Sequence, residues 1–381
     1  MKIAIIGTRG IPGKYGGFET FAEKISERFV KSGFATIVYG RSEYYSESEK
    51  NSHYKGIKTV YLNTIRIKQF ETIIHSIKCT LHSIFIEKVN CVILCNVASS
   101  INLPILKIFG KRVVINVDGL EWKRNKWSRM AKTVFKIFER ISVLFGKKNI
   151  ITDSLAISEY YKKKFGISAT FIPYGGQILR KKDTLPISDL EKKYNFKKGE
   201  YFLQITRFVP ENNVYYILKN FIRSKTKKKF ILIGGDHYHG KYCSKIKKIC
   251  KKDNRIILTG FIYDKKEIDT LLFNAFAYIH GNEVGGTNPA LLQAMGGGHI
   301  VFSIDTVFNR EVLKSTGIYF NKSGYDLGQK IDLLENNPES GEQLPGLALK
   351  NLRINYSWDR ISERYLKKLS ALRTHVPKDI E

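Results

Sequence analysis

The order of hydrophobic and polar positions along the chain predicts alternating strands and helices. KIAIIG (residues 2–7) and FATIVYG (34–40) are short apolar runs, and the segment from Phe18 to Lys31 lies between them. In this segment apolar side chains recur at helical spacing, and charged side chains such as Glu23 and Lys24 lie on the other side. The chain therefore opens with a strand, a helix and a second strand.

The same alternation continues through the rest of the chain. Two further apolar runs extend the first series, and four more follow the segment IPYGG (172–176). They are VNCVILCNV (89–97), KRVVINVDG (111–119), YFLQITRF (201–208), KKFILIGG (228–235), NRIILTG (254–260) and AFAYIHG (275–281). Continuous apolar runs are typical of strands buried on both faces of a parallel sheet. We therefore expect the α/β class, with two Rossmann-like doubly wound domains facing a cleft.

We place the first domain at residues 1–172 and the second at 173–355, and we expect a C-terminal helix within 356–381 to pack back towards the first domain. Open parallel sheets bind ligands beyond the carboxyl ends of their strands. The segments directly after the strands are therefore the candidate site.

The composition restricts the classes of partner and the cellular location that we expect. The 64 Lys and Arg residues against 35 Asp and Glu give a net charge of +29, which indicates nucleic acid or anionic lipid headgroups, unless lysines merely decorate solvated faces. No signal peptide and no apolar run of membrane-spanning length is apparent, so we expect a cytoplasmic protein. The five cysteines show no zinc spacing and are expected to be reduced core thiols.

Two loops of the first domain carry candidate chemistry. GTRGIPGKYGGFET (7–20) places five glycines ahead of a helix, which favours a ligand loop over a structural one, with positive charge from Arg9 and Lys14. It lacks the dinucleotide fingerprint G-x-G-x-x-G. NVDGLEWKRNKWS (116–128) suits a hydroxyl-rich ligand, or is an ordinary polar loop around a buried tryptophan.

The second domain offers an anion site. Arg207 follows the strand YFLQI, and its guanidinium matches phosphate oxygens in pairs. In YIHGNEVGGTNPALLQAMGGG (278–298), Thr287 or Asn288 can cap a helix whose first residue is Pro289. The N–H groups of that turn would hold a diphosphate. His280 at the strand end is a catalytic candidate or a satisfied structural histidine.

With these segments in hand, the chain resembles bacterial glycosyltransferases of family 4, which have the GT-B architecture, and within them the branch of capsule and O-antigen rhamnosyltransferases. The segments GTRGIPGKYGGFET, NVDGLEWKRNKWS, RFVPENN, IHGNEVGGTNPALLQAM and FNREV carry the likeness. The resemblance implies the roles of three groups of residues. The catalytic group is Asp118, Glu121, His280 and Glu283; the donor-binding group is Gly16, Gly17, Arg207, Asn212, Gly285, Gly286, Thr287, Asn288 and Gln293; and the acceptor-binding group is Arg9, Lys14, Tyr15, Trp122, Lys123 and Arg124.

The chain departs from the family at charged positions. A lysine that follows the arginine is replaced by Asn212 or Asn213, and two glutamates are replaced by Gly285 and Gln293. An uncharged Gln293 would suit a deoxyribose donor such as a thymidine diphosphate sugar, or would reflect reduced activity.

The resemblance implies transfer of rhamnose, with retention, from thymidine diphosphate rhamnose to a lipid-linked oligosaccharide in surface polysaccharide synthesis. A uridine or guanosine diphosphate sugar, a nicotinamide-dependent oxidoreductase and a nucleic-acid-binding protein remain the alternatives, although nucleic acid lacks a binding signature here. Neither a metal nor a cofactor is expected.

The basic segment 126–148 places Trp127, Met130, Val134, Ile137, Ile141 and Leu144 at helical spacing among Lys and Arg. This pattern fits a helix on an anionic membrane surface, and equally a helix packed on the first sheet. A peripheral location on the inner face of the plasma membrane is the expectation that follows.

Overall fold

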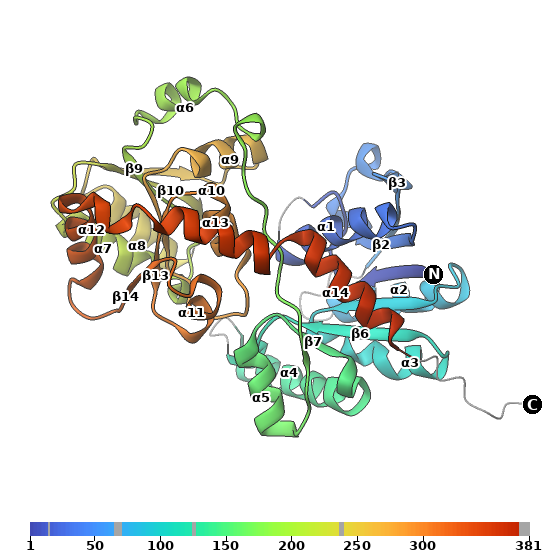
Figure 1. The fold of residues 1–381 in the computed structure, drawn as a ribbon. Coiled ribbons are helices and arrows are strands. Elements are labelled where there is room, and N and C mark those ends of the chain that lie inside the picture. Colours follow the sequence, from blue (N-terminus) through green and yellow to red (C-terminus); the bar gives the residue numbers. More distant parts are fainter. Residues whose placement is uncertain (14–15, 65–70, 124–126, 236–239, 373–381) are drawn as a thin grey trace, which may run out of the picture. The chain divides into compact units, whose positions relative to one another are not determined.

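The computed structural model describes residues 1–13, 16–64, 71–123, 127–235 and 240–372. Its contacts divide the chain into two compact units, the first formed by Met1–Gly175 with Trp358–Glu381 and the second by Gly176–Ser357. Each unit is an α/β body with its own sheet (Figure 1). Our expected boundaries, 172/173 and 355/356, lie close to these divisions. Lys14, Tyr15 and Arg124, which were predicted to bind the acceptor, lie outside the described residues.

The first unit is built on an eight-stranded sheet of order β3-β4-β2-β1-β5-β6-β7-β8, parallel except for the short hairpin between β3 and β4. Its strands are β1 (Lys2–Ile6), β2 (Ala35–Arg41), β3 (His53–Tyr54), β4 (Ile57–Leu62), β5 (Cys91–Cys95), β6 (Arg112–Val117), β7 (Ile150–Thr152) and β8 (Thr170–Phe171). The expected apolar runs all became strands, whereas β4 and the short strands β3, β7 and β8 were not predicted.

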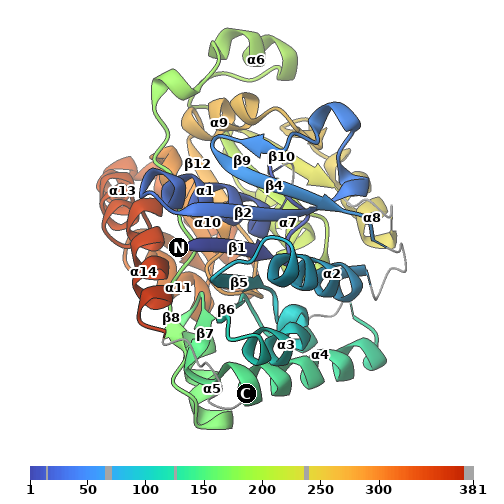
Figure 2. The ribbon, with the colours of Figure 1, turned by 90° about the vertical axis from the view of Figure 1, so that its right-hand side faces the viewer.

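Helices cover both faces of this sheet (Figure 2). They are α1 (Gly17–Lys31), α2 (Glu71–Phe85), α3 (Leu103–Ile108), α4 (Arg129–Ile141), α5 (Leu155–Phe165) and α14 (Trp358–Ser370), with the short turns η1 (Ser42–Tyr44), η2 (Glu47–Glu49), η3 (Val97–Asn102), η4 (Glu121–Lys123), η5 (Ser142–Gly146) and η6 (Lys147–Asn149). The chain crosses the sheet in one direction from β1 to β2 and in the opposite direction from β4 to β5. Right-handed crossovers therefore place α1 on one face and α2 and α3 on the other.

The C-terminal helix α14 returns to the first unit and packs on α1. Phe21 of α1 lies 5.2 Å from the ring of Tyr365 and 6.4 Å from the ring of Trp358. These side chains join the strand residues Ile3 and Ile93 in one buried cluster between the sheet and the two helices. The five cysteines of the chain are buried and unpaired, as expected.

The second unit has a six-stranded parallel sheet of order β11-β10-β9-β12-β13-β14. Its strands are β9 (Tyr201–Arg207), β10 (Lys229–Gly235), β11 (Ile256–Gly260), β12 (Ala277–His280), β13 (Ile300–Ile304) and β14 (Ile318–Phe320). Its helices are α6 (Ile187–Tyr194), α7 (Val214–Arg223), α8 (Lys241–Cys250), α9 (Lys265–Phe273), α10 (Pro289–Gly297), α11 (Val307–Leu313), α12 (Asp326–Asn336) and α13 (Leu344–Asn355), with the turns η7 (Lys181–Asp183), η8 (Pro210–Asn212) and η9 (Pro338–Gly341). The four predicted strands are β9 to β12.

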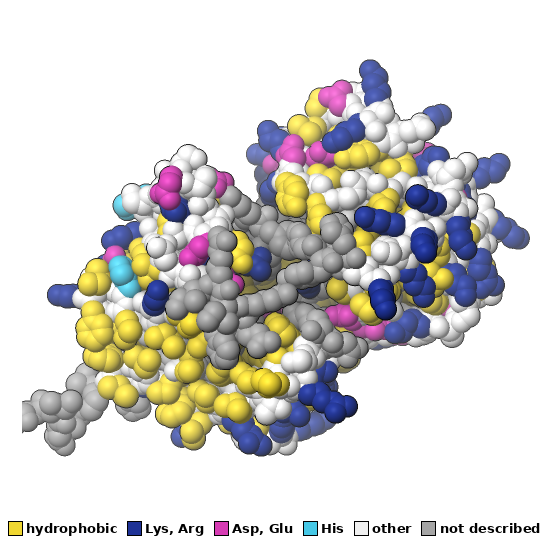
Figure 3. All heavy atoms as spheres, turned by 180° about the vertical axis from the view of Figure 1, so that it is seen from behind, with side chains coloured by type: hydrophobic (Ala, Val, Ile, Leu, Met, Phe, Trp, Pro, Cys, Tyr) yellow, Lys and Arg dark blue, Asp and Glu magenta, His cyan; other side chains and the backbone are white. Residues whose placement is uncertain are grey.

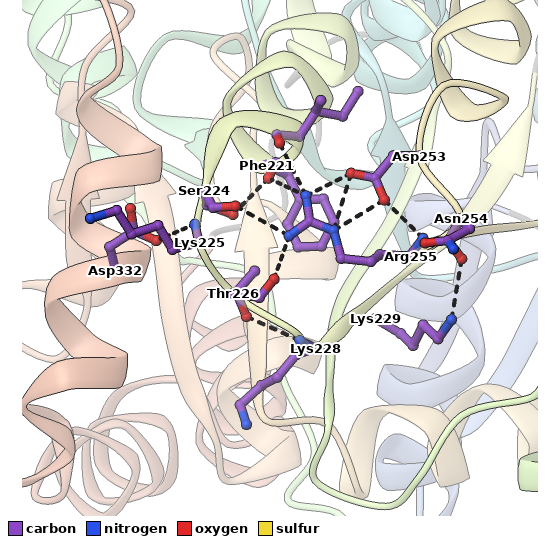
Figure 4. Close-up of polar contacts among 11 residues, drawn as sticks. Phe221, Ser224, Lys225, Thr226, Lys228, Lys229, Asp253, Asn254, Arg255 and Asp332 are labelled. Atoms are coloured by element: carbon purple, nitrogen blue, oxygen red, sulfur yellow. Dashed lines mark hydrogen bonds and ion pairs between the residues drawn. The ribbon is translucent and has the colours of Figure 1, made fainter.

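Arg255, just before β11, holds the end of α7 (Figure 4). Its guanidinium pairs with Asp253 (Nη2 to Oδ2, 2.6 Å) and donates to the carbonyl oxygens of Phe221 (3.3 Å) and Ile222 (3.1 Å) in the last turn of the helix. It also donates to the carbonyl oxygen of Ser224 (3.2 Å). The last carbonyl groups of a helix lack hydrogen-bond donors within the helix. Here the guanidinium of Arg255 donates hydrogen bonds to several carbonyl groups at the end of α7.

Candidate functional site

The glycine-rich loop of the first unit is held by two carboxylates of α1. Glu19 accepts a hydrogen bond from the backbone N–H of Arg9 (2.8 Å), and Glu23 accepts one from the backbone N–H of Gly13 (2.9 Å). Glu19 is buried. Two N–H groups that a phosphate could have used are therefore already bound to negative charges within the protein.

The carboxylate of Glu19 also fills the space above Gly16. Gly16 has φ +121°, and a Cβ added to it would lie 2.1 Å from Oε2 of Glu19. The glycine is therefore required by this contact and by its backbone conformation. Gly17 begins α1 and its carbonyl accepts the Tyr174 hydroxyl (2.6 Å). A diphosphate over Gly16 and Gly17, as the resemblance implies, would lie against a buried carboxylate, so repulsion makes these two glycines poor diphosphate ligands.

Arg9 presents its side chain from the same loop. Its guanidinium lies 5.0 Å from the ring centre of Tyr44, and that of Arg41 lies 5.9 Å from the same ring. Arg41 is buried and pairs with Glu71 (2.9 Å), whereas the Arg9 side chain is exposed. An exposed guanidinium stacked on an aromatic ring is held in one place and stays available to an anionic or hydroxyl-bearing acceptor.

Asp118 directly follows β6 and is half-buried. Burial raises the pKa of the Cys95 thiol at the end of β5, and the charges of Glu19 and Asp118 raise that pKa further. The structure thus brings the carboxylates of Glu19 and Asp118 to the same end of the central strands. Sequence reasoning named only Asp118; an acidic residue in the first turn of the helix after the glycine run is the signal that could have identified Glu19.

The rest of the Asp118 loop packs towards α4. Glu121 is buried and accepts the Trp127 indole N–H (2.8 Å). Trp122 donates its indole N–H to Glu139 (3.2 Å). Lys123 is exposed, and its ammonium group lies 5.6 Å from the Trp122 ring centre.

Further cations approach the same indole. The ammonium groups of Lys136 and Lys164 each lie 5.3 Å from the Trp122 ring centre. Glu121 was predicted to be catalytic, and Trp122 was predicted to bind the acceptor. Because one is buried with the Trp127 indole and the other is engaged by lysines and Glu139, their contacts fit a structural role in this loop better.

In the second unit, Arg207 ends β9 and is exposed. Asn212 is buried and donates its side-chain amide to Oγ1 of Thr206 and to the carbonyl of Arg207 (both 2.9 Å). Asn213 is also buried and donates to the carbonyl of Gly281 (2.8 Å). Asn212 therefore fixes the backbone that carries Arg207 and does not replace the charge of the family's lysine; its assignment to the donor site stays a prediction.

The loop after β12 has the predicted helix start. The side chain of Asn288 accepts from the N–H of Ala290 (3.0 Å), and Pro289 is the first residue of α10, which confirms the capping prediction. Gly285 has φ +136°, and open space surrounds its Cα. Gly286 and Thr287 are buried, whereas Gln293 is exposed on α10.

Two asparagines brace this loop. Asn309 of α11 donates its side-chain amide to the carbonyl of Asn282 (3.0 Å), and the Thr206 hydroxyl donates to Oδ1 of Asn282 (3.3 Å). The end of β9, which carries Arg207, is thus tied to the loop that leads into α10.

Glu283 in this loop forms an ion pair with Lys322, which follows β14 and is half-exposed. Lys322 was not named from the sequence, because nothing near it in the chain marks it as part of the site. The pair brings an ammonium group to the carboxyl edge of the sheet that also carries Arg207. This edge thus carries Lys322 in addition to Arg207, with the Lys322 ammonium group paired to Glu283.

His280 is 1% exposed. Burial lowers its pKa to about 3, so the imidazole is neutral at physiological pH. Among the described residues its Nε2 has no hydrogen-bond partner. A neutral, buried imidazole can donate or accept one hydrogen bond but supplies no positive charge to a leaving phosphate. Within the described residues, no group of three or more His, Cys, Asp or Glu side chains could hold a metal ion.

Solved glycosyltransferase structures share this fold. HepE of Anabaena in complex with UDP is 13% identical, with a TM-score of 0.76 over 98% of this chain and 100% of HepE. Sucrose-phosphate synthase from Thermosynechococcus elongatus is 16% identical, with a TM-score of 0.76 over 97% of this chain and 100% of its own. A glycosyltransferase from Rickettsia africae is 15% identical, with a TM-score of 0.74 over 97% of both chains. The fold is therefore of the GT-B class.

Two family models match the sequence itself. Residues 1–177 match a domain of unknown function, DUF1972, and residues 187–345 match the glycosyl transferases group 1 family. The second unit therefore matches a glycosyltransferase family model over residues 187–345, and the first unit matches DUF1972. No curated protein matches the chain in sequence.

Proposed function

We propose that the enzyme transfers a sugar from a nucleoside diphosphate sugar to a hydroxyl group of a lipid-linked glycan. The observation that carries the proposal is the exposed guanidinium of Arg207, to which the described residues offer no ion-pair partner, at the same sheet edge as the start of α10. A guanidinium and a helix amino terminus both attract a diphosphate. We assign donor binding to the second unit and acceptor binding to the first.

The leaving diphosphate gains negative charge as its bond to the anomeric carbon breaks. Arg207 and Lys322 would stabilise that charge without a metal, together with the N–H groups at the start of α10. The acceptor hydroxyl forms the new bond to the anomeric carbon and gives its proton to the departing phosphate oxygen. Asp118 would orient the acceptor hydroxyl through a hydrogen bond. In this scheme the configuration of the sugar is retained, and His280 and Glu283 position groups around the donor.

The donor we favour is thymidine diphosphate rhamnose. The family's ribose-binding glutamate is replaced by the exposed, uncharged Gln293 on α10. A donor without the 2′-hydroxyl would therefore lose the least binding free energy from this replacement. UDP-glucose is the alternative, because HepE, 14% identical over 98% of this chain with a TM-score of 0.76, was also solved with UDP-glucose. The product would belong to a bacterial capsule or O-antigen, made at the cytoplasmic face of the membrane. No helix among the described residues is long and apolar enough to cross a membrane.

A thermal titration with thymidine, uridine and guanosine diphosphate sugars tests the donor, since a ligand that binds only the folded state raises the melting temperature. We expect thymidine diphosphate rhamnose to give the largest rise. We expect Arg207→Ala to abolish that rise without changing the melting temperature of the unliganded protein. Arg223→Ala, at the end of α7, is the control and should leave the ligand-induced rise intact. An equal rise in the Arg207→Ala variant would remove Arg207 from the site, and a larger rise with another sugar would exclude rhamnose.

A further inference from the structure

The first unit exposes several large apolar side chains on and next to its helices α2, α3 and α4. Those of α4 and η5 are Met130 (76% exposed), Val134 (36%), Ile137 (50%) and Leu144 (63%). Those at the ends of α2 and α3 are Leu81 (40%), Phe85 (54%), Ile86 (68%), Ile108 (71%) and Phe109 (44%). We call these nine residues the apolar surface. Large contiguous apolar areas of this kind mark contact with another molecule or with a membrane.

The apolar surface is continuous across its helices. The rings of Phe85 and Phe109 meet edge to face at 5.1 Å, which joins the ends of α2 and α3. Helix α3 packs beside η5, which carries Leu144 and directly continues α4. Figure 3 shows hydrophobic side chains gathered over one broad area of the first unit, with Lys and Arg at its border.

Helix α4 turns its apolar side outwards. Its buried residues are Phe138 and Glu139, whereas Met130 and Ile137 are exposed. The sequence pattern left open whether this helix lies on a membrane or packs on the sheet. The exposure of these side chains shows that this part of the apolar face does not pack on the sheet.

The border of the apolar surface is cationic. Arg129, Lys136 and Arg140 of α4 are exposed, and the acidic residue of this helix, Glu139, is buried against Lys164 (3.0 Å). Burial lowers the pKa of Lys107 on α3, and the nearby charge of Lys147 lowers that pKa further. Adjacent cations that repel each other are stabilised by an anion.

A hollow of about 430 Å³ lies at one end of this border. Its lining residues include Leu144 of the apolar surface together with Lys147, Lys148 and Ser168. It therefore combines an apolar wall with ammonium groups. The hollow could take the phosphate of a lipid headgroup while the acyl chains lie against the neighbouring side chains.

We propose that the apolar surface and its cationic border dock the first unit on an anionic lipid bilayer. The proposal rests on the proposed function, because a lipid-linked acceptor presents its sugar at a membrane surface. Helix α4 begins shortly after the Asp118 loop and leads through η5 and η6 to the start of β7. An apolar face along α4 therefore keeps the loop that carries Asp118 close to the bilayer. Binding to an anionic bilayer would account for the net charge of +29. The ends of α2 and α3 extend the apolar surface beyond the segment that the sequence pattern indicated.

Flotation of the full chain with vesicles, without any nucleotide sugar, tests the proposal. Vesicles of phosphatidylcholine alone are compared with vesicles containing a third phosphatidylglycerol. We expect binding that requires the anionic lipid and weakens with salt. Leu144→Glu should weaken it about tenfold or more, since it places a charge among acyl chains. Leu333→Glu is the matched control, because Leu333 is 60% exposed on α12 of the second unit.

The cationic border is tested with a second pair of variants. Lys147→Ala with Lys148→Ala should weaken binding to anionic vesicles, whereas Lys181→Ala with Lys182→Ala, in the comparable turn η7, should not. Equal binding by Leu144→Glu and the unaltered protein would overturn the proposal. So would a dimer in sedimentation velocity that Leu144→Glu dissociates, because a second copy would then cover the surface. Loss of donor binding in the thermal titration would refute the proposed function instead and leave vesicle binding unchanged.

Discussion

The carboxylate of Glu19 accepts the backbone N–H of Arg9 at 2.8 Å, across the loop that the sequence marks as a phosphate cradle. A buried carboxylate beside Gly16 makes this loop unsuited to a second anion and suited to hydroxyl groups, which can donate to it. In the proposed reaction, Glu19 and Asp118 of the first unit would bind the sugar acceptor, and Arg207 and Lys322 of the second unit would bind the diphosphate. The proposed reaction thus uses carboxylates to bind the acceptor and cations to bind the donor.

Removing the Glu19 carboxylate distinguishes the two interpretations of the loop. Glu19→Ala leaves the Arg9 N–H without its charged acceptor, an interaction of roughly 1.5–3 kcal/mol, so we expect slower transfer with unchanged donor affinity. Calorimetric titration of the donor and initial rates measure the two effects. If donor affinity instead rises, the loop holds the diphosphate, because the variant has removed a repelling charge. Glu23→Ala, which releases Gly13, is the matched comparison.

Lys322 is expected to replace the lysine that the family has after Arg207. Lys322→Ala should weaken donor binding about tenfold, since a charge-assisted hydrogen bond to phosphate is lost. Lys330→Ala is the control, because Lys330 pairs with Asp326 at 2.8 Å within α12. Calorimetry with nucleoside diphosphate alone gives the affinities. Equal affinities for Lys322→Ala and Lys330→Ala would show that Lys322 serves only to hold Glu283.

Arg255 should matter for stability and not for donor binding. Arg255→Ala leaves carbonyl groups at the end of α7 without their donor and Asp253 without its cation, so we expect a loss of roughly 2–4 kcal/mol. Lys229→Ala, which removes a 3.2 Å bond to the Asn254 carbonyl in the same network, should change stability little (Figure 4). Urea unfolding measures both. A change in m-value would mean either that the variant alters the compactness of the unfolded state or that unfolding is no longer two-state.

Sequence patterning predicted β1, β2, β5, β6 and β9 to β12, because strands buried in a parallel sheet appear as continuous apolar runs, but it missed β3, β4, β7, β8, β13 and β14. It also gave the start of α10, where Asn288 and Pro289 have local capping preferences. It could not give the Glu283–Lys322 pair, because these residues follow β12 and β14, which are far apart in the chain and are separated by β13 in the sheet. Nor could it distinguish a ligand-binding tryptophan from Trp122, whose partners Glu139 and Lys164 come from helices further along the chain.

Buried histidines make stability depend on pH. Burial lowers the pKa of His75 to about 4, although its hydrogen bond with the Gly40 carbonyl (3.0 Å) opposes the shift. Burial also lowers the pKa of His280 to about 3 and that of His299 to about 4. The unfolded chain, with a histidine pKa of about 6.5, binds protons that the folded chain does not. Stability is therefore complete above about pH 6.5 and falls towards pH 4, each histidine contributing up to about 1.4 kcal/mol per pH unit.

Urea unfolding at several values between pH 7 and pH 4 measures that slope. Replacing His75 by glutamine removes one titrating group, so His75→Gln should unfold more easily than the unaltered protein at pH 7 and lose less stability on acidification. His53→Gln is the control, because His53 is exposed and its substitution should leave the slope unchanged. Parallel curves for all three proteins would show that His75 does not titrate differently in the folded and unfolded states, and the acid loss would then have to come from other groups.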